Sequence, residues 1–217
     1  MDEEIKNNVM KSGTSILGIV CKDGIIMAAD RRATAGNLVM SKNTKKAVKL
    51  NDYLVVSGTG MASDIDMLQK VVAAELRIKE LRSKQRPTVK DAANLISMLS
   101  YRNIRQFSTI PSIAGTLIAG LNDDGTFELY TIEPAGSIAR VEDYDANFSS
   151  GMPFIFGLLE RQWKKDITIK QGVELALEAL KASTQRDVGS GNGVDIFTIT
   201  KQGINQVLEQ TIEPSFR

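Results

Sequence analysis

Short apolar runs bounded by turn residues dominate the start of the sequence. Residues 15–20 and 25–29 are mostly apolar, and the Lys22-Asp23-Gly24 turn between them predicts a hairpin. Residues 47–50 and 53–57 predict a second strand pair. The residues that separate these two pairs are mainly polar, and we expect them to form a loop.

Apolar residues that recur every three or four positions predict two pairs of helices. We expect the first helix to span residues 63–83, with Ser63 as its cap, and the second to open at Pro87-Thr88. The third helix is expected over residues 153–164, and Thr168 is expected to cap the fourth.

Strands return between and after the helix pairs. Residues 112–121 and 127–132 predict one hairpin, followed by a short segment around Ile138, and residues 194–200 begin a last hairpin through Lys201-Gln202-Gly203. Strand groups beside helix pairs indicate a layered α+β domain, and two sheets between two helix layers, an α-β-β-α sandwich, would satisfy the pattern. We expect residues 14–217 to form one domain and only residues 1–13 to be detachable.

Composition narrows the possible partners and the cellular location. Lys and Arg number 27 and Asp and Glu number 26, so the net charge of +1 argues against nucleic acid or an anionic membrane as the main partner. The single cysteine, Cys21, excludes an internal disulfide and indicates a reducing compartment. No apolar run approaches the ~18 residues of a membrane span, and the N-terminus lacks a secretory signal. We therefore expect a cytoplasmic protein.

The sequence contains no histidine. Ser-His-Asp and Cys-His catalysis are therefore impossible within this chain, and so are the common zinc sites that use histidine. We expect neither a metal nor a cofactor. If the protein is a hydrolase, another group must act as the base near neutral pH.

Gly13-Thr14 is a candidate self-cleavage site. The alternative is a flexible tail that meets an edge strand, which is common. Cleavage before Thr14 would free an α-amine with an ordinary pKa of about 7.7–8.0, beside the threonine hydroxyl. Gly13, which lacks a Cβ, would let that hydroxyl approach the scissile carbonyl. The absence of histidine gives this interpretation weight.

The segment GIVCKDGIIMAADRRATAG, residues 18–36, resembles the start of mature archaeal-type proteasome beta subunits. Further blocks fall in the order and at the spacing of that family. They are Asn43-Thr44-Lys45-Lys46, Ser57-Gly58-Thr59-Gly60, Ser149-Ser150-Gly151-Met152-Pro153-Phe154 and Gln185-Arg186-Asp187-Val188-Gly189-Ser190-Gly191. The resemblance covers residues 14 to about 210 and implies the N-terminal nucleophile hydrolase fold.

By this resemblance Thr14 is the nucleophile of a threonine endopeptidase, and Asp30 and Lys46 are the carboxylate and ammonium beside it. Lys46 would favour alkoxide character in the hydroxyl and keep the amine neutral, while Asp30 would hold the lysine charged. Taken alone, Asp30 could be a surface charge at a strand end and Lys46 one of a solvated lysine pair. Their joint spacing from Thr14 favours the catalytic interpretation.

Four further residues match supporting positions of the family. Ser150, Asp187 and Ser190 would orient the terminal amine and a proton-shuttling water, although each is also an ordinary turn, helix-end or loop residue. Gly60 would supply the backbone N–H that stabilises the oxyanion, or it could simply be a turn glycine.

The resemblance also implies a substrate groove. Thr34 and Ala62 would grip the substrate backbone as an added strand. The pocket for the residue before the scissile bond (P1) would be lined by Ala33, Thr44, Val48, Gly58, Ala62 and Asp66. The small residues imply room for a large apolar side chain. Asp66 could favour a basic one, or could be a solvated acid in the first turns of a helix.

One position departs from the family pattern. The family usually has threonine directly after the nucleophile, whereas this chain has Ser15. Serine keeps the hydroxyl but lacks the methyl group that restricts χ1. Self-processing could therefore be slower or could depend on a partner subunit.

The resemblance implies a closed proteolytic chamber. Seven-membered beta rings would stack face to face between alpha-subunit rings, and an activating ATPase would feed in unfolded polypeptide. A non-cleaving structural ring subunit is the alternative; loss of Thr14, Asp30 or Lys46 would favour it, and all three are present. A small-molecule amidohydrolase is disfavoured by the family blocks after Lys46.

Overall fold

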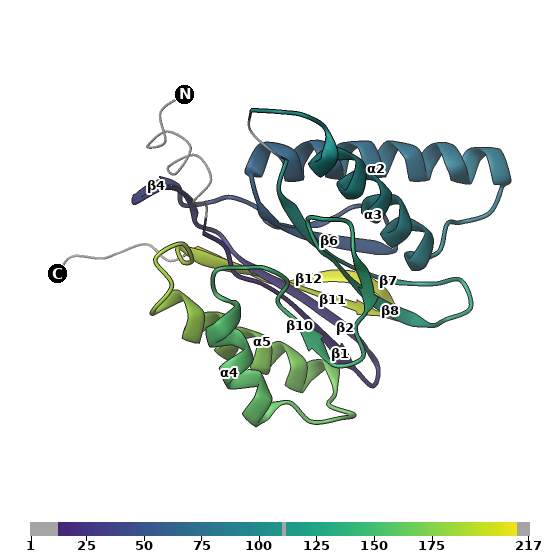
Figure 1. Ribbon diagram of the computed structural model, residues 1–217. Helices are drawn as coiled ribbons and strands as arrows, with labels where there is room; N and C mark the ends of the chain where they lie inside the picture. The colour runs from purple at the N-terminus through teal and green to yellow at the C-terminus, as the bar shows by residue number, and fades with distance from the viewer. Residues whose placement is uncertain (1–12, 110–111, 212–217) are drawn as a thin grey trace.

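The computed structural model describes residues 13–109 and 112–211, and its main elements are two five-stranded antiparallel sheets (Figure 1). Residues 1–12 of the expected propeptide lie outside the described residues. The first sheet has the strand order β10-β1-β2-β11-β12. Its strands are β1 (Ile16–Cys21), β2 (Gly24–Asp30), β10 (Tyr144–Asp145), β11 (Gly193–Thr200) and β12 (Gly203–Thr211).

The second sheet has the order β5-β6-β7-β8-β9. Its strands are β5 (Ala47–Lys49), β6 (Leu54–Gly60), β7 (Ala114–Leu121), β8 (Phe127–Ile132) and β9 (Ile138–Arg140). A two-stranded ribbon, β3 (Ala33–Ala35) and β4 (Leu38–Ser41), occupies the stretch expected to be a loop. Its outward residues, including Leu38 and Met40, are exposed, so the ribbon lacks the alternating burial that marks a strand in sequence.

Four helices lie among the described residues: α2 (Ala62–Ser83), α3 (Val89–Arg105), α4 (Met152–Gln162) and α5 (Ile169–Thr184). The Thr168 cap was predicted correctly, and Thr88 caps α3; each makes a capping box with the residue three positions later. The Ser63 cap was wrong, because α2 already begins at Ala62 and has Met61 at its N-cap without a side-chain hydrogen bond. None of these helices is long and apolar enough to cross a membrane.

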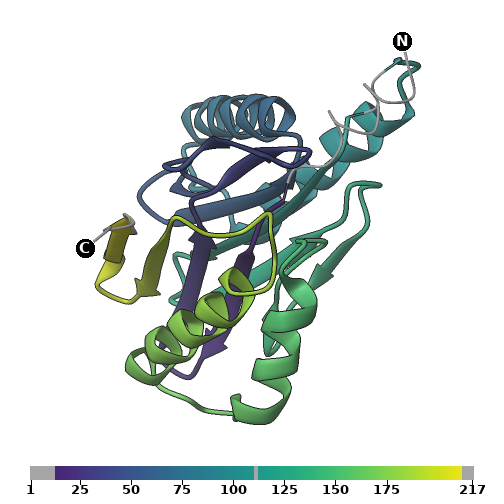
Figure 2. The same ribbon diagram turned by 90° about the vertical axis from the view of Figure 1, so that its left-hand side faces the viewer.

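The helices cover the outer faces of the two sheets. α5 packs on β2 and β11 with α4 beside it, whereas α2 and α3 pack on β6, β7 and β8. Figure 2 shows α4 and α5 at the opposite side of the sheets from α2. A third apolar cluster, which includes Ile16, Met27 and Leu117, fills the space between the sheets. Because β2 has one face toward α5 and the other toward the second sheet, all of its residues are buried, which explains its uninterrupted apolar run.

Candidate active site

Thr14 lies directly before β1 and is 4% exposed. Its Oγ1 atom donates a 2.7 Å hydrogen bond to the carbonyl oxygen of Gly13, and its backbone N–H donates a 2.9 Å bond to Oγ of Ser150. The hydroxyl is therefore held beside the carbonyl group of the peptide bond that precedes it.

Gly13 occupies a position where no side chain fits. A Cβ atom built on it would lie 2.0 Å from Cα of Gly189, because the two backbones touch. Its N–H donates a 2.9 Å hydrogen bond to Oγ1 of Thr34. The close contact and this bond fix the orientation of the Gly13 carbonyl relative to the Thr14 hydroxyl.

Asp30, at the end of β2, is fully buried and not a surface charge. Its Oδ1 accepts hydrogen bonds from Nζ of Lys46 at 2.7 Å and from the Ser15 N–H at 2.8 Å. Its Oδ2 accepts bonds of 2.9 Å from the N–H groups of Arg32 and Gly191. Four donors satisfy the carboxylate, as a buried charge requires.

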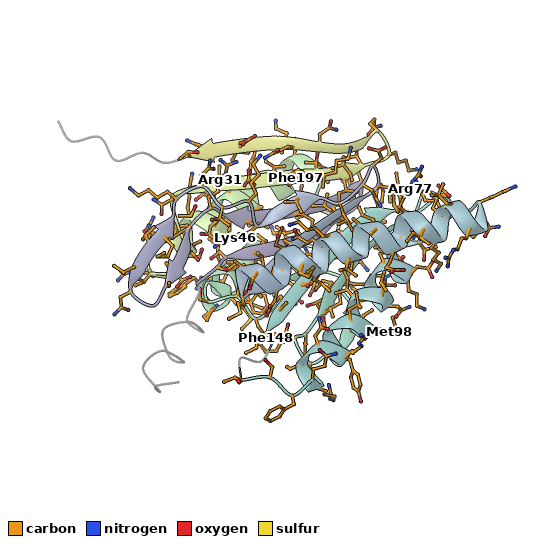
Figure 3. The ribbon with its side chains drawn as sticks, turned by 90° about the horizontal axis from the view of Figure 1, so that it is seen from above. Arg31, Lys46, Arg77, Met98, Phe148 and Phe197 are labelled. Carbon is orange, nitrogen blue, oxygen red and sulfur yellow. The ribbon has the colours of Figure 1, made fainter. Side chains whose placement is uncertain are left out.

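Lys46 immediately precedes β5, is 7% exposed and is labelled in Figure 3. Besides its ion pair with Asp30, its Nζ atom donates a 3.2 Å hydrogen bond to the Gly13 carbonyl oxygen. Burial lowers the pKa of Lys46 below the ordinary lysine value, while the charge of Asp30 opposes that shift. The ammonium thus polarises the same carbonyl that the Thr14 hydroxyl contacts.

Ser150, Asp187 and Ser190 form one hydrogen-bonded group beside the Thr14 nitrogen. Oδ2 of Asp187 accepts from Oγ of Ser150 at 2.6 Å and from Oγ of Ser190 at 2.5 Å. Ser150 in turn accepts from the Thr14 N–H. The three side chains are far from Thr14 in sequence, and the group contacts the Thr14 nitrogen through Ser150.

A cleft of about 280 Å³ opens beside Thr14. The predicted residues on its lining are Gly13, Thr14, Ala33, Thr44, Lys46, Gly58, Gly60, Ala62 and Asp66. Gly60 ends β6 with φ +113°, and a Cβ there would lie 2.2 Å from the carbonyl oxygen of Ile113, so a side chain is excluded. The end of β6, the start of α2, the segment before β5 and Ala33 of β3 thus surround Thr14 in the cleft.

Two predicted binding residues are not on the lining of this cleft. Val48 is not part of the lining; it packs on the apolar cluster of α2 and α3. Thr34 also lies off the lining, and its hydroxyl binds the Gly13 N–H instead. The side chain of Asp66 is 63% exposed and makes a 2.6 Å ion pair with Lys70, one helical turn later.

Sequence reasoning missed Lys45, Ile65 and Gln69 on the lining. Ile65 lies on α2, where apolar residues recur every three or four positions, a pattern that indicates core residues. In the structure its side chain fills the space that Gly58 leaves, because a Cβ on Gly58 would lie 2.5 Å from Cγ2 of Ile65. Ile65 therefore forms a floor under the cleft and reduces the room that the glycine alone would provide.

Comparison with known proteins identifies the family of this chain. The "Proteasome subunit" family matches residues 10–199. The chain is 38% identical over 194 residues to the proteasome subunit beta of Nanoarchaeum equitans, covering 89% of this chain and 96% of that protein. It is 37% identical over 201 residues to the proteasome subunit beta 1 of Thermococcus kodakarensis, covering 93% of this chain and 95% of that protein. It is 34% identical to the Methanopyrus kandleri beta subunit over 94% of this chain and 95% of that protein. The chain belongs to the proteasome subunit family and is a beta subunit.

Proposed function

We propose that this beta subunit is a threonine endopeptidase whose nucleophile is the hydroxyl of Thr14. The observation that carries the proposal is the shared contact on the Gly13 carbonyl oxygen, which accepts from Thr14 Oγ1 at 2.7 Å and from Lys46 Nζ at 3.2 Å. A hydroxyl and a buried ammonium on one carbonyl group are what acyl transfer to that hydroxyl requires.

The first reaction is removal of residues 1–13. Oγ1 of Thr14 attacks the Gly13 carbonyl carbon, and Lys46 stabilises the negative charge that develops on the oxygen. The C–N bond then breaks, and the departing nitrogen gains the proton that the hydroxyl has lost. Water hydrolyses the resulting ester, which leaves a Gly13 carboxylate and a free Thr14 amine.

In the mature subunit the Thr14 amine acts as the base. It takes the hydroxyl proton as Oγ1 attacks a substrate carbonyl, and returns it to the leaving amine. The resemblance assigns oxyanion stabilisation to the Gly60 N–H, and water then releases the acyl group. Ser150, Asp187 and Ser190 hold the nitrogen, and Lys46 favours its neutral form.

The only cysteine is a poor alternative nucleophile. Burial raises the pKa of the Cys21 thiol to about 12, so it carries almost no thiolate at neutral pH. The layer order of helices, sheet, sheet and helices is consistent with the N-terminal nucleophile hydrolase sandwich that the resemblance implies.

We further propose that the subunit works in the cytoplasm inside a chamber of heptameric beta rings capped by alpha-subunit rings. An activating ATPase would deliver unfolded polypeptide to the chamber. Substrate would lie as an added strand near Thr34 and Ala62 and place its P1 side chain above Ile65. Because Asp66 is exposed and paired with Lys70, we expect Leu- and Tyr-ended peptides to be cleaved faster than Arg-ended ones.

Intact mass of the beta chain before and after assembly with alpha subunits tests the proposal. The expected result is a loss equal to residues 1–13 in the wild type and no loss in Thr14→Ala. Full assembly with an unchanged wild-type mass would instead support a structural ring subunit.

A further inference from the structure

The hydroxyl of Ser15 lies in a buried network that leads to the active site. Ser15 is fully buried, and its Oγ lies 2.7 Å from Oγ of Ser183 on α5 and 2.7 Å from Oγ of Ser190. Gly151 packs directly against it, since a Cβ on Gly151 would lie 1.9 Å from Ser15 Oγ. The Ser15 side chain therefore has a tightly defined place between two other serines.

The direction of each hydrogen bond in this network follows from the Asp187 carboxylate. A carboxylate only accepts, so Ser190 must give its single proton to Asp187 Oδ2, 2.5 Å away. The Ser190 oxygen can then only accept a hydrogen bond from Ser15, so the single hydroxyl proton of Ser15 lies in that bond. Ser15 consequently accepts a hydrogen bond from the Ser183 hydroxyl. The alternative acceptor for the Ser183 proton is the Leu180 carbonyl oxygen, at 3.1 Å.

The other side of Asp187 leads to the nucleophile. Ser150 gives its proton to the same Oδ2 atom at 2.6 Å, which is closer than its other acceptor, the Thr14 carbonyl oxygen at 3.1 Å, and it accepts from the Thr14 nitrogen at 2.9 Å. The donors therefore run from Ser183 through Ser15 and Ser190 to Asp187, and from Thr14 through Ser150 to the same carboxylate. Each bond in such a chain polarises the next.

We propose that Ser15 is a positioning residue for the Thr14 amine, acting through Ser190 and Asp187. The proposal rests on the function proposed above, because the amine forms only after cleavage. Without the Ser15 donor, Ser190 becomes a weaker donor to Asp187. More negative charge then remains free on the carboxylate, which makes the nearby amine hold its proton more strongly.

The contacts of the other charged groups near the site do not involve the Ser15 hydroxyl. Asp30 accepts from the backbone N–H of Ser15, not from its side chain, and Lys46 remains on Asp30. Arg32 binds Asn192 and the Val188 carbonyl oxygen. A shift in the pH profile of a Ser15 variant would therefore reflect the hydrogen bonds that lead from Ser15 through Ser190 to Asp187.

The test uses full-length chains assembled into core particles, with completed processing verified by mass. Peptide hydrolysis is measured against pH for wild type, Ser15→Ala, Ser15→Thr and Ser183→Ala. Ser100→Ala is the matched control, since Ser100 is a buried serine on α3 whose hydroxyl has no hydrogen-bond partner in the described part of the chain.

We expect Ser15→Ala to lower kcat about three- to tenfold, with KM little changed, and to move the acidic limb of the profile to higher pH. Ser15→Thr keeps a hydroxyl at this position and should leave both kcat and the acidic limb as in wild type. Ser183→Ala should have a smaller effect than Ser15→Ala, because the Ser15 hydroxyl can still donate to Ser190. An unshifted acidic limb in Ser15→Ala, or equal losses in Ser15→Ala and Ser100→Ala, would overturn the proposal. If wild-type particles hydrolyse peptides and Thr14→Ala particles do not, the proposed function stands and such a failure concerns Ser15 alone.

Discussion

Nζ of Lys46 donates a 2.7 Å hydrogen bond to Oδ1 of Asp30, and the two side chains are 7% and 0% exposed. Two opposite charges have thus been removed from water next to the Thr14 hydroxyl. Neither can be neutralised without leaving its partner as an isolated buried charge, which is far more costly than losing a surface ion pair.

Replacing Asp30 by asparagine should therefore damage stability as well as activity. We expect Asp30→Asn to lower the free energy of unfolding by about 3–5 kcal/mol, because it leaves the Lys46 ammonium buried without a counter-ion. Thermal or denaturant unfolding measures the change. Asp52→Asn is the matched control, since Asp52 is 99% exposed and pairs with Lys49, and it should have little effect. Equal losses in the two variants would contradict this account of the pair.

Gly13→Ala should slow self-cleavage strongly. The added Cβ would meet Cα of Gly189 at 2.0 Å and push the scissile carbonyl away from Thr14 Oγ1. Because small displacements of reacting groups cost on the order of 100-fold in rate, we expect cleavage to slow by about that factor. Intact mass against time after assembly gives the rate.

The control for Gly13→Ala is Gly157→Ala. Gly157 lies in α4, and a Cβ there has no neighbour within 4 Å. This variant should process at the wild-type rate, and normal processing of Gly13→Ala as well would mean that the Gly13–Gly189 contact does not orient the bond.

Local signals made most of the fold predictable. Thr168 and the Gln171 side chain that completes its capping box are close in sequence, and the apolar run of β2 reflects burial on both faces. The β3–β4 ribbon was missed because its apolar residues Leu38 and Met40 face outward and no alternation marks it.

The site depended on contacts between distant segments. The Ser190–Asp187–Ser150 group assembles beside Thr14 from the far end of the chain, and only the family resemblance placed it there. The resemblance also put Val48 in the pocket, whereas the lining of the cleft includes Ile65 and not Val48. A helical apolar residue carries no sequence signal that separates core from pocket floor.

Ile65→Ala should broaden the pocket. A small apolar space lined by Gly58, Leu68 and Val72, among others, lies against Ile65, and truncation would join it to the cleft. We expect the ratio of kcat/KM for Trp-ended over Leu-ended peptides to rise about tenfold, at a stability loss of about 2 kcal/mol. Ile65→Val, which keeps most of the side chain, should change the ratio little. An unchanged ratio in Ile65→Ala would contradict the assignment of Ile65 as the floor of the cleft.

The pH dependence of peptide hydrolysis should reflect the protonation of the buried Lys46. Because burial lowers the pKa of Lys46 below the ordinary 10.5, the ammonium loses its proton at lower pH than a surface lysine would. Neutral Lys46 no longer favours alkoxide character in the attacking Thr14 hydroxyl, so kcat/KM for peptides should fall as pH rises, with a midpoint below 10.5. Peptide hydrolysis across alkaline pH measures this limb, with unfolding monitored in parallel. Full activity through pH 10.5 in a folded particle would contradict the role given to Lys46.

The most direct measurement is peptide hydrolysis by core particles whose beta chains are produced with residue 14 as a free N-terminus. Processing is then unnecessary, so the chemistry of Thr14 is isolated from removal of the propeptide. Particles with Thr14 should hydrolyse peptides, and those with alanine at this position should be at least about a thousandfold slower. Equal hydrolysis by the two particles would contradict the assignment of Thr14 as nucleophile and base.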